Sequence, residues 1–243
     1  MALSAQDKEN IYTLLKTAKT YASGYIPKEF KEEMPVFTDD VPEKITKTSA
    51  ITLDEIANKV QNCHNCQLEK SKSENSAGSG CAHPLLLVVT LQPLSQNAEI
   101  LLEKMLSSIC LDKTLNCFVT SIIKCKGENI NNPSEDEINC CKAYLNAQVH
   151  ILKPKYILSL GEKISQSLLK TDYPLQRLRT KVWGCRLGNK ESDPILPLIT
   201  SFSPEELLEN QNAKALAWQD LKMLRTKLSE KFTEYKNILM QAK

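Results

Sequence analysis

The sequence predicts an α/β fold with a central four-stranded parallel sheet covered by helices on both faces. Four apolar runs predict the strands, at residues 85–89, 117–123, 156–160 and 195–200. The runs are continuously apolar rather than alternating, which is typical of strands buried on both faces. Helical patterns separate them, at residues 97–109, 134–151 and 161–170, and a closing helical region spans 213–240. Strand alternating with helix predicts a parallel sheet in a three-layer sandwich.

The chain is expected to divide near residue 50. Residues 7–22 have the apolar spacing of a helix, and residues 26–50 carry several prolines and many charges, as a linker does. We therefore expect an N-terminal helical extension with its linker over residues 1–50 and the α/β domain over residues 51–243. Thr52 with Glu55, and Ser134 with Glu137, have the spacing of capping boxes, so each pair predicts the start of a helix.

The bulk composition sets broad limits on function. The formal net charge of the 243 residues is +2, which permits a local basic patch but does not demand one. Residues 1–7 lack the basic start and apolar run of a signal peptide, and no stretch is apolar enough to span a membrane. We expect a cytoplasmic monomer that is not associated with a membrane. The sequence indicates no particular protein partner.

Nine cysteines are many for a protein without a secretory signal, and they favour metal ligation over disulfides. Cys63 and Cys66 form a C-x-x-C motif, Cys125 follows the second predicted strand, and Cys140 and Cys141 lie in the helix predicted over 134–151. Neighbouring helical residues point to different faces, so only one of the last two can be a ligand. Four thiolates suit Zn²⁺ or a [4Fe–4S] cluster, and the spacing alone does not choose between them.

The order of these motifs resembles the iron–sulphur uracil-DNA glycosylases, often called family 4, over roughly residues 51–232. The matching segments are Cys63–Leu68, Lys72 with Gly78-Ser79-Gly80, Ser121–Cys125, the set Pro133, Glu137, Cys141, Leu145 and Gln148, then Lys153–Gly161, Leu178–Thr180 and Ala217–Leu221. The resemblance implies a four-stranded glycosylase sandwich that acts on DNA. It also implies a [4Fe–4S] cluster on Cys63, Cys66, Cys125 and Cys141, because its register selects Cys141 over Cys140.

The resemblance also implies catalytic residues that this sequence lacks. Leu91 stands where the family has the acidic residue that positions water, within Thr90–Leu94, where the family also has two glycines. Ser121 replaces the asparagine that reads uracil, and a hydroxyl cannot make paired amide contacts. Ser203 replaces the histidine that stabilises the uracil anion. Lost donors of this kind each cost a few kcal/mol in the transition state. Uracil excision is therefore expected to be weak or absent.

Three functional hypotheses follow. In the first, the protein is an inactive or weak glycosylase homologue that retains DNA binding or a structural role, with Lys124, Lys126, Arg179 and Lys181 as a basic rim for phosphates. In the second, it is a glycosylase with altered damaged-base specificity. In the third, it is a zinc-bound or metal-free interaction protein without a nucleic-acid role, motivated by the near-neutral charge and by acidic Glu205 and Glu206.

Overall fold

The computed structural model describes residues 51–127, 133–188 and 193–241. These residues belong to one compact unit that spans residues 49–243. The extension predicted over residues 1–50, with its helix at 7–22, lies outside the described residues. No helix within the described ranges is long and apolar enough to cross a membrane.

The main sheet contains the four predicted parallel strands as its centre. Its strand order is β2-β4-β3-β6-β8-β7, and β3, β4, β6 and β8 run parallel to one another. The bounds of these four strands are β3 Leu86–Thr90, β4 Cys117–Ser121, β6 Tyr156–Leu160 and β8 Ile195–Ser201. Three of them lie within a residue or so of the predicted runs, and β4 ends at Ser121 rather than at residue 123.

The expectation of four strands is incomplete, because an antiparallel strand closes each edge of the main sheet. These are β2 Ser79–Gly80 and β7 Trp183–Arg186, and a separate small sheet pairs β1 Glu74–Asn75 with β5 Cys125–Lys126. Edge strands are half-exposed and short, so they lack the continuous apolar run by which the central strands were predicted. The result is a mixed six-stranded sheet.

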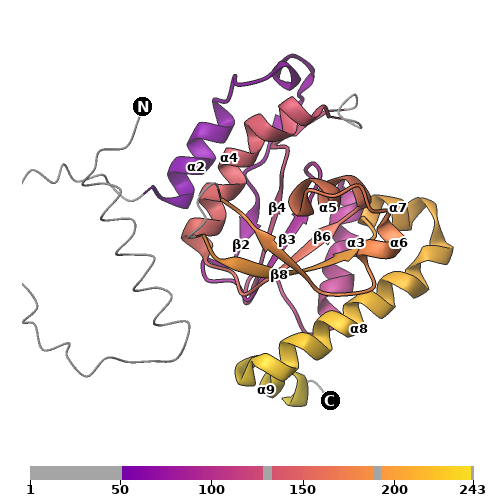
Figure 1. The fold of residues 1–243 in the computed structure, drawn as a ribbon. Helices are drawn as coiled ribbons and strands as arrows, with labels where there is room; N and C mark the ends of the chain where they lie inside the picture. Colours follow the sequence, from indigo (N-terminus) through magenta and orange to yellow (C-terminus); the bar gives the residue numbers. More distant parts are fainter. Residues whose placement is uncertain (1–50, 128–132, 189–192, 242–243) are drawn as a thin grey trace, which may run out of the picture. The chain divides into compact units, whose positions relative to one another are not determined.

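Helices cover both faces of the sheet, as predicted (Figure 1). The helices are α2 Leu53–Gln61, α3 Gln96–Ser107, α4 Glu135–Leu152, α5 Glu162–Leu169, α6 Leu175–Leu178, α7 Pro204–Glu209, α8 Lys214–Lys231 and α9 Thr233–Gln241, with 3₁₀ turns η1 Gln67–Ser71 and η2 Gln211–Ala213. The closing region predicted over 213–240 is therefore two helices, α8 and α9, after a 3₁₀ turn. Both predicted capping boxes, at Thr52 and Ser134, are confirmed.

The core has two halves, one on each face of the sheet. Leu86 and Val88 of β3 pack with α3, α7, α8 and α9, whereas Leu87 and Val89 pack with α4 and α5. Successive strand residues point to opposite faces, so a continuously apolar strand contributes to both halves. This is the three-layer sandwich that the apolar runs predicted.

Candidate functional site

The C-x-x-C loop lies between α2 and η1 and is held by hydrogen bonds to backbone carbonyl oxygens. Cys63 follows the last turn of α2, and Cys66 is the N-cap of η1. Asn75 Nδ2 donates to the carbonyl oxygens of Val60 at 2.9 Å and Gln61 at 3.1 Å. Lys72 Nζ donates to the Cys63 carbonyl oxygen at 3.2 Å. These contacts fix the loop against the small β1-β5 sheet.

Cys125 and Cys141 face the same part of the molecule from β5 and α4. Cys125 is paired with Asn75 in the register of β1 and β5, which places it beside the residue that holds the C-x-x-C loop. On α4, Ile138, Cys141 and Leu145 recur every three or four residues and are all buried, whereas Cys140 is exposed. Cys141 is thus buried beside Cys125, whereas Cys140 is exposed, and the choice of Cys141 over Cys140 as a ligand stays a prediction.

The four thiols share one electrostatic environment. Burial, followed by the negative charges of Cys141, Cys66 and Cys63, raises the pKa of the Cys125 thiol to about 11. Burial is also the first cause of the raised pKa of Cys141, with Cys66 and Cys63 adding to it. Thiolates bind metal ions, so cations nearby favour the binding form. Lys72 acts to lower the pKa of Cys125, and Lys124 acts to lower the pKa of Cys141.

The four thiols fit, by their chemistry, the metal that the motifs imply. Three of them are buried, and together they match in number and softness the ligands of an iron–sulphur cluster. Within the described ranges, no three or more His, Cys, Asp or Glu side chains are arranged to hold a metal ion as they stand. The fit therefore rests on the type and shared environment of the donors rather than on a closed coordination geometry.

Lys124 does not lie on an exposed basic rim, contrary to expectation. Its side chain is only 1% exposed. Lys124 Nζ donates to Ser121 O at 2.6 Å, Thr120 Oγ1 at 2.7 Å and Gln148 Oε1 at 2.8 Å. Gln148 Nε2 in turn donates to the Ala77 carbonyl oxygen. The lysine therefore ties the end of β4 to α4, next to the cysteines, and cannot reach a phosphate in this arrangement.

Arg179 is also buried rather than exposed on a rim. Its Nε donates to Asp220 Oδ2 at 2.9 Å, and Ser201 Oγ donates to the same oxygen at 2.8 Å. Burial raises the pKa of the Asp220 carboxyl, and the hydrogen bonds from Arg179 and Ser201 oppose that shift. Of the four predicted phosphate ligands, only Lys126, which is half-buried, and Lys181, which is exposed, reach the surface.

The carboxyl ends of β3, β6 and β8 meet at a cavity of about 500 Å³. Leu91 and Ser203, two of the positions at which the expected catalytic residues are substituted, both line it. Gly161 lies on its wall, after β6, with a φ of +109°, a conformation that favours glycine. Ligands of open α/β sheets bind at the carboxyl ends of the strands, so the cavity is where this fold class places a ligand.

Ser121, the third substituted position, lines a separate cavity of only about 40 Å³. Pro93 and Leu94 form part of its wall, and Leu94 is 6% exposed and belongs to the hydrophobic core. A water needs about 10–15 Å³ of such volume, so this space accommodates roughly three waters. Ser121 therefore borders little open space in this arrangement.

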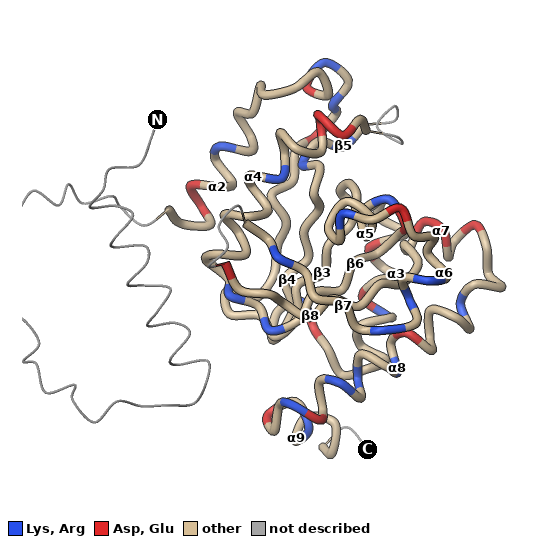
Figure 2. The backbone as a smooth tube through the Cα atoms, in the orientation of Figure 1, with Lys and Arg blue, Asp and Glu red and all other residues tan. Residues whose placement is uncertain are grey.

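Ser203 is occupied by the helix that follows it. Glu206 N donates to Ser203 Oγ at 3.2 Å, and Ser203 N donates to Glu206 Oε2 at 2.7 Å, which forms a capping box at the start of α7. The hydroxyl therefore serves as a helix N-cap. Acidic residues surround this position, as the red segment of α7 in Figure 2 shows.

Two polar groups in the larger cavity were not among the predicted site residues. Burial raises the pKa of the Glu205 carboxyl, and the neighbouring charges of Glu206 and Glu209 add to the shift. Gln92 Oε1 is buried and has no hydrogen-bond partner among the described residues. An unpaired buried acceptor is costly, so its position favours a ligand that donates a hydrogen bond. Gln92 lies in the Thr90–Leu94 segment that was matched to the family, but the sequence did not indicate that its side chain is buried and unpaired, because this depends on how β3, β6 and β8 come together.

Comparison with known proteins finds similarity to uracil-DNA glycosylases. A family model described as the uracil DNA glycosylase superfamily matches residues 82–222. The chain is 26% identical over 72% of its length to the "Type-4 uracil-DNA glycosylase" of Sulfurisphaera tokodaii, of which it covers 84%. It is 26% identical over 77% of its length to the protein of the same name from Saccharolobus solfataricus, of which it covers 91%. For the Archaeoglobus fulgidus protein of that name, the identity is 28% over 65% of this chain and 83% of the relative.

Proposed function

The chain belongs to the uracil-DNA glycosylase superfamily, and on that premise we propose that it keeps the scaffold and a [4Fe–4S] cluster of a DNA base-excision repair protein but excises uracil weakly or not at all. In this proposal it retains DNA binding or a structural role. The observation that carries the proposal is the 40 Å³ cavity at Ser121, which Leu94 helps to fill.

The chemistry of uracil excision explains why this cavity matters. Breaking the N-glycosidic bond requires a flipped-out base, donors to its carbonyl oxygens and a positioned water. Ser121 can offer one hydroxyl where paired amide contacts are needed, Leu91 cannot orient water, and the Ser203 hydroxyl already accepts the N–H of Glu206. Each missing donor costs a few kcal/mol of transition-state stabilisation. Together they support a catalytic rate far below that of an active family member.

The cluster, when bound, supplies a covalent structural link, and Cys63, Cys66, Cys125 and Cys141 would hold it. The electrostatic influence of Cys63, Cys66 and Cys141 on Cys125, and of Lys124 on Cys141, supports this assignment. We expect anaerobically purified protein to contain iron and to absorb broadly near ~400 nm, as thiolate-bound clusters do. Cys141→Ser should lose most of the iron, whereas the matched Cys140→Ser should retain it. A colourless wild-type protein containing zinc would contradict the cluster and favour the interaction-protein hypothesis.

DNA binding is proposed to depend on surface cations rather than on the buried ones. Lys126 and Lys181 reach the surface, so each contact with a phosphate should release counterions. Lys126→Ala and Lys181→Ala should each weaken oligonucleotide binding uniformly across sequences and reduce the salt slope by about 1. Lys104→Ala, on the exposed face of α3, is the control that should leave the slope unchanged. Binding whose strength is independent of salt would contradict this assignment.

A second candidate function is a glycosylase with altered base specificity. The cavity of about 500 Å³ favours it, because Gln92 offers an unpaired acceptor and Glu205 a partly buried carboxyl. Iron-loaded protein should be incubated with oligonucleotides that each carry one deaminated or oxidised base. Excision of any of these bases that is abolished by Gln92→Ala would favour the second candidate over the first. Intact substrates throughout, with binding retained, would support the first.

A further inference from the structure

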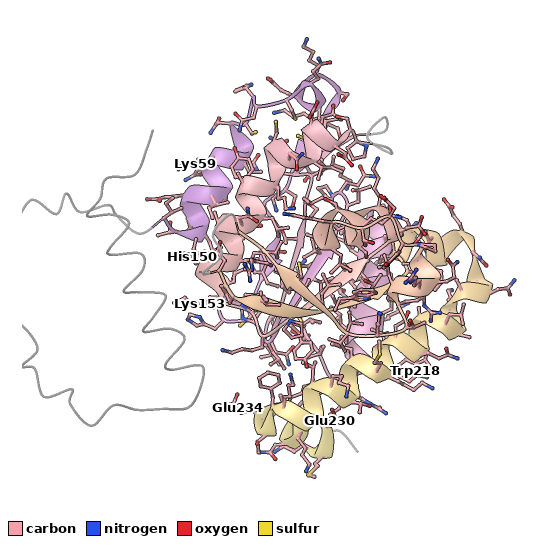
Figure 3. All side chains as sticks on the ribbon, in the orientation of Figure 1. Lys59, His150, Lys153, Trp218, Glu230 and Glu234 are labelled. Atoms are coloured by element: carbon pink, nitrogen blue, oxygen red, sulfur yellow. The ribbon has the colours of Figure 1, made fainter. Side chains whose placement is uncertain are left out.

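A large groove lies at the amino ends of the parallel strands, opposite to the carboxyl ends that line the candidate site. It has a volume of about 840 Å³ and is lined by the carboxyl end of α4, the amino ends of β6 and β8, and the junction of α8 and α9. Figure 3 labels His150 and Lys153 at that end of α4. The cysteines, the substituted positions and the proposed function do not use this groove.

The floor of the groove is apolar and partly exposed. Ile195, the first residue of β8, is 60% exposed, and Leu196, Pro197 and Phe232 are half-buried beside it. An exposed aliphatic side chain that is continuous with half-buried apolar neighbours in a groove is typical of a contact surface.

Lysines surround this floor. The side chains of Lys153, Lys155 and Lys231 are exposed and line the groove together with that of His150, while Asp193 is the single acidic residue among the described lining residues. Lys231 also lies over the ring of Tyr156, with Nζ 5.6 Å from the centroid. The rim therefore favours carboxylates between apolar contacts.

Two further features of the groove can form hydrogen bonds with a peptide backbone. Asn146 Oδ1 is buried and has no partner among the described residues. β8 begins at Ile195 but pairs with β6 only from Leu198 onward, so on that side residues 195–197 have no paired strand in the described part of the chain. Their other side pairs with β7. An open strand edge takes up an extended peptide through main-chain hydrogen bonds.

We propose that this groove binds an extended acidic peptide segment of a partner protein, with apolar side chains alternating with Asp or Glu. The backbone N–H groups of the peptide would satisfy Asn146 Oδ1 and the open β8 edge. Its apolar side chains would contact Ile195 and Phe232, and its carboxylates would pair with Lys153 and Lys155. A DNA backbone fits less well, because a phosphodiester has no N–H donors and gains nothing from an aliphatic floor.

The test uses the full chain and an arrayed set of 12-residue fluorescent peptides, with binding followed by anisotropy. One series alternates Leu, Ile or Phe with Glu, a second keeps the apolar residues and has Lys in place of Glu, and a third keeps Glu and has Ser at the apolar positions. We expect saturable binding by members of the first series only. Ile195→Asp and Lys155→Glu should each weaken it at least tenfold.

Matched variants separate the groove from general effects. Leu115→Asp replaces a more exposed leucine (73%) that does not line the groove, and Lys104→Glu reverses a charge on α3. Both should leave peptide binding unchanged. The proposal is overturned if no peptide of the Glu series binds, or if the series with Ser at the apolar positions binds equally well. It is also overturned if an unmodified oligonucleotide competes with the peptide for the wild-type protein and for the Ile195→Asp variant to the same extent. None of these outcomes bears on uracil excision, so this proposal and the proposed function fail independently.

Discussion

At the scale of single residues, two basic side chains expected at the surface turn out to be buried. Lys124 and Arg179 are each held by partners that lie far away in the sequence, such as Gln148 and Asp220. Short-range sequence patterns cannot reveal such partners. Lysine and arginine usually lie at the surface, so the sequence alone predicts both side chains to be exposed. The C-x-x-C loop and the buried side of α4 at Cys141 were easier to predict, because each depends on spacing within a short segment.

The Arg179–Asp220 pair leads to a stability prediction. Arg179→Ala leaves Asp220, 4% exposed, without its cation, and should lower the free energy of unfolding by about 3–5 kcal/mol. Arg179→Met combined with Asp220→Leu should cost less, because no charge is left buried alone. Urea denaturation measures both, and Lys227→Ala, in the exposed pair with Glu230, should change little. A single variant no less stable than the double variant would contradict the assignment.

Glu205 gives a pH prediction whose sign follows from burial. Because burial raises its pKa above the ordinary 4.5, the folded state binds the proton more tightly than the unfolded state. The stabilisation from the protonated form is complete below pH 4.5 and is lost as the pH rises through the raised pKa. Glu205→Gln should therefore be more stable than wild type at about pH 7, and the difference should vanish at acidic pH, below the ordinary pKa. Denaturation midpoints across this range measure it, and a variant less stable at neutral pH would contradict the burial argument.

At the scale of elements, the sequence predicted what local chemistry determines and missed what the sheet edges determine. The capping boxes at Thr52 and Ser134 were visible as spacings, and both form. The box at Ser203 has the same spacing, but Ser203 was interpreted only as a lost catalytic residue. The edge strands β2 and β7 have no buried run to mark them and exist because neighbouring strands offer unpaired backbone groups.

The cap of α4 matters because this helix carries Cys141. Ser134→Ala removes the acceptor for the Glu137 N–H and should lower the free energy of unfolding by about 1 kcal/mol. Thr226→Ala, at an exposed position inside α8, is the matched control and should be neutral or slightly stabilising. Chemical denaturation of the two variants checks the difference, and an equal effect in both would show that the box contributes nothing.

At the scale of the whole molecule, the layered fold followed from four apolar runs, whereas the state of the pocket did not. Substitutions at Leu91, Ser121 and Ser203 indicated missing catalytic groups, but only the structure separates a 40 Å³ space at Ser121 from a 500 Å³ cavity beside it. Cavity volumes depend on how side chains such as Leu94 pack between strands and helices. The groove at the amino ends of β6 and β8 could not be predicted from the sequence either, because α4, β6, β8 and α8 contribute to it together.

The decisive measurement for the loss of uracil excision is the single-turnover rate of uracil release from a uracil-containing oligonucleotide by iron-loaded protein. The Type-4 uracil-DNA glycosylase of Archaeoglobus fulgidus, assayed in parallel, provides the reference. Because several donors to the transition state are missing, each worth a few kcal/mol, we predict a rate at least about 10³-fold below the reference, while the protein still binds the oligonucleotide. A rate within about tenfold of the reference would contradict this prediction, since the cavity at Ser121 would then have to open far enough to admit uracil.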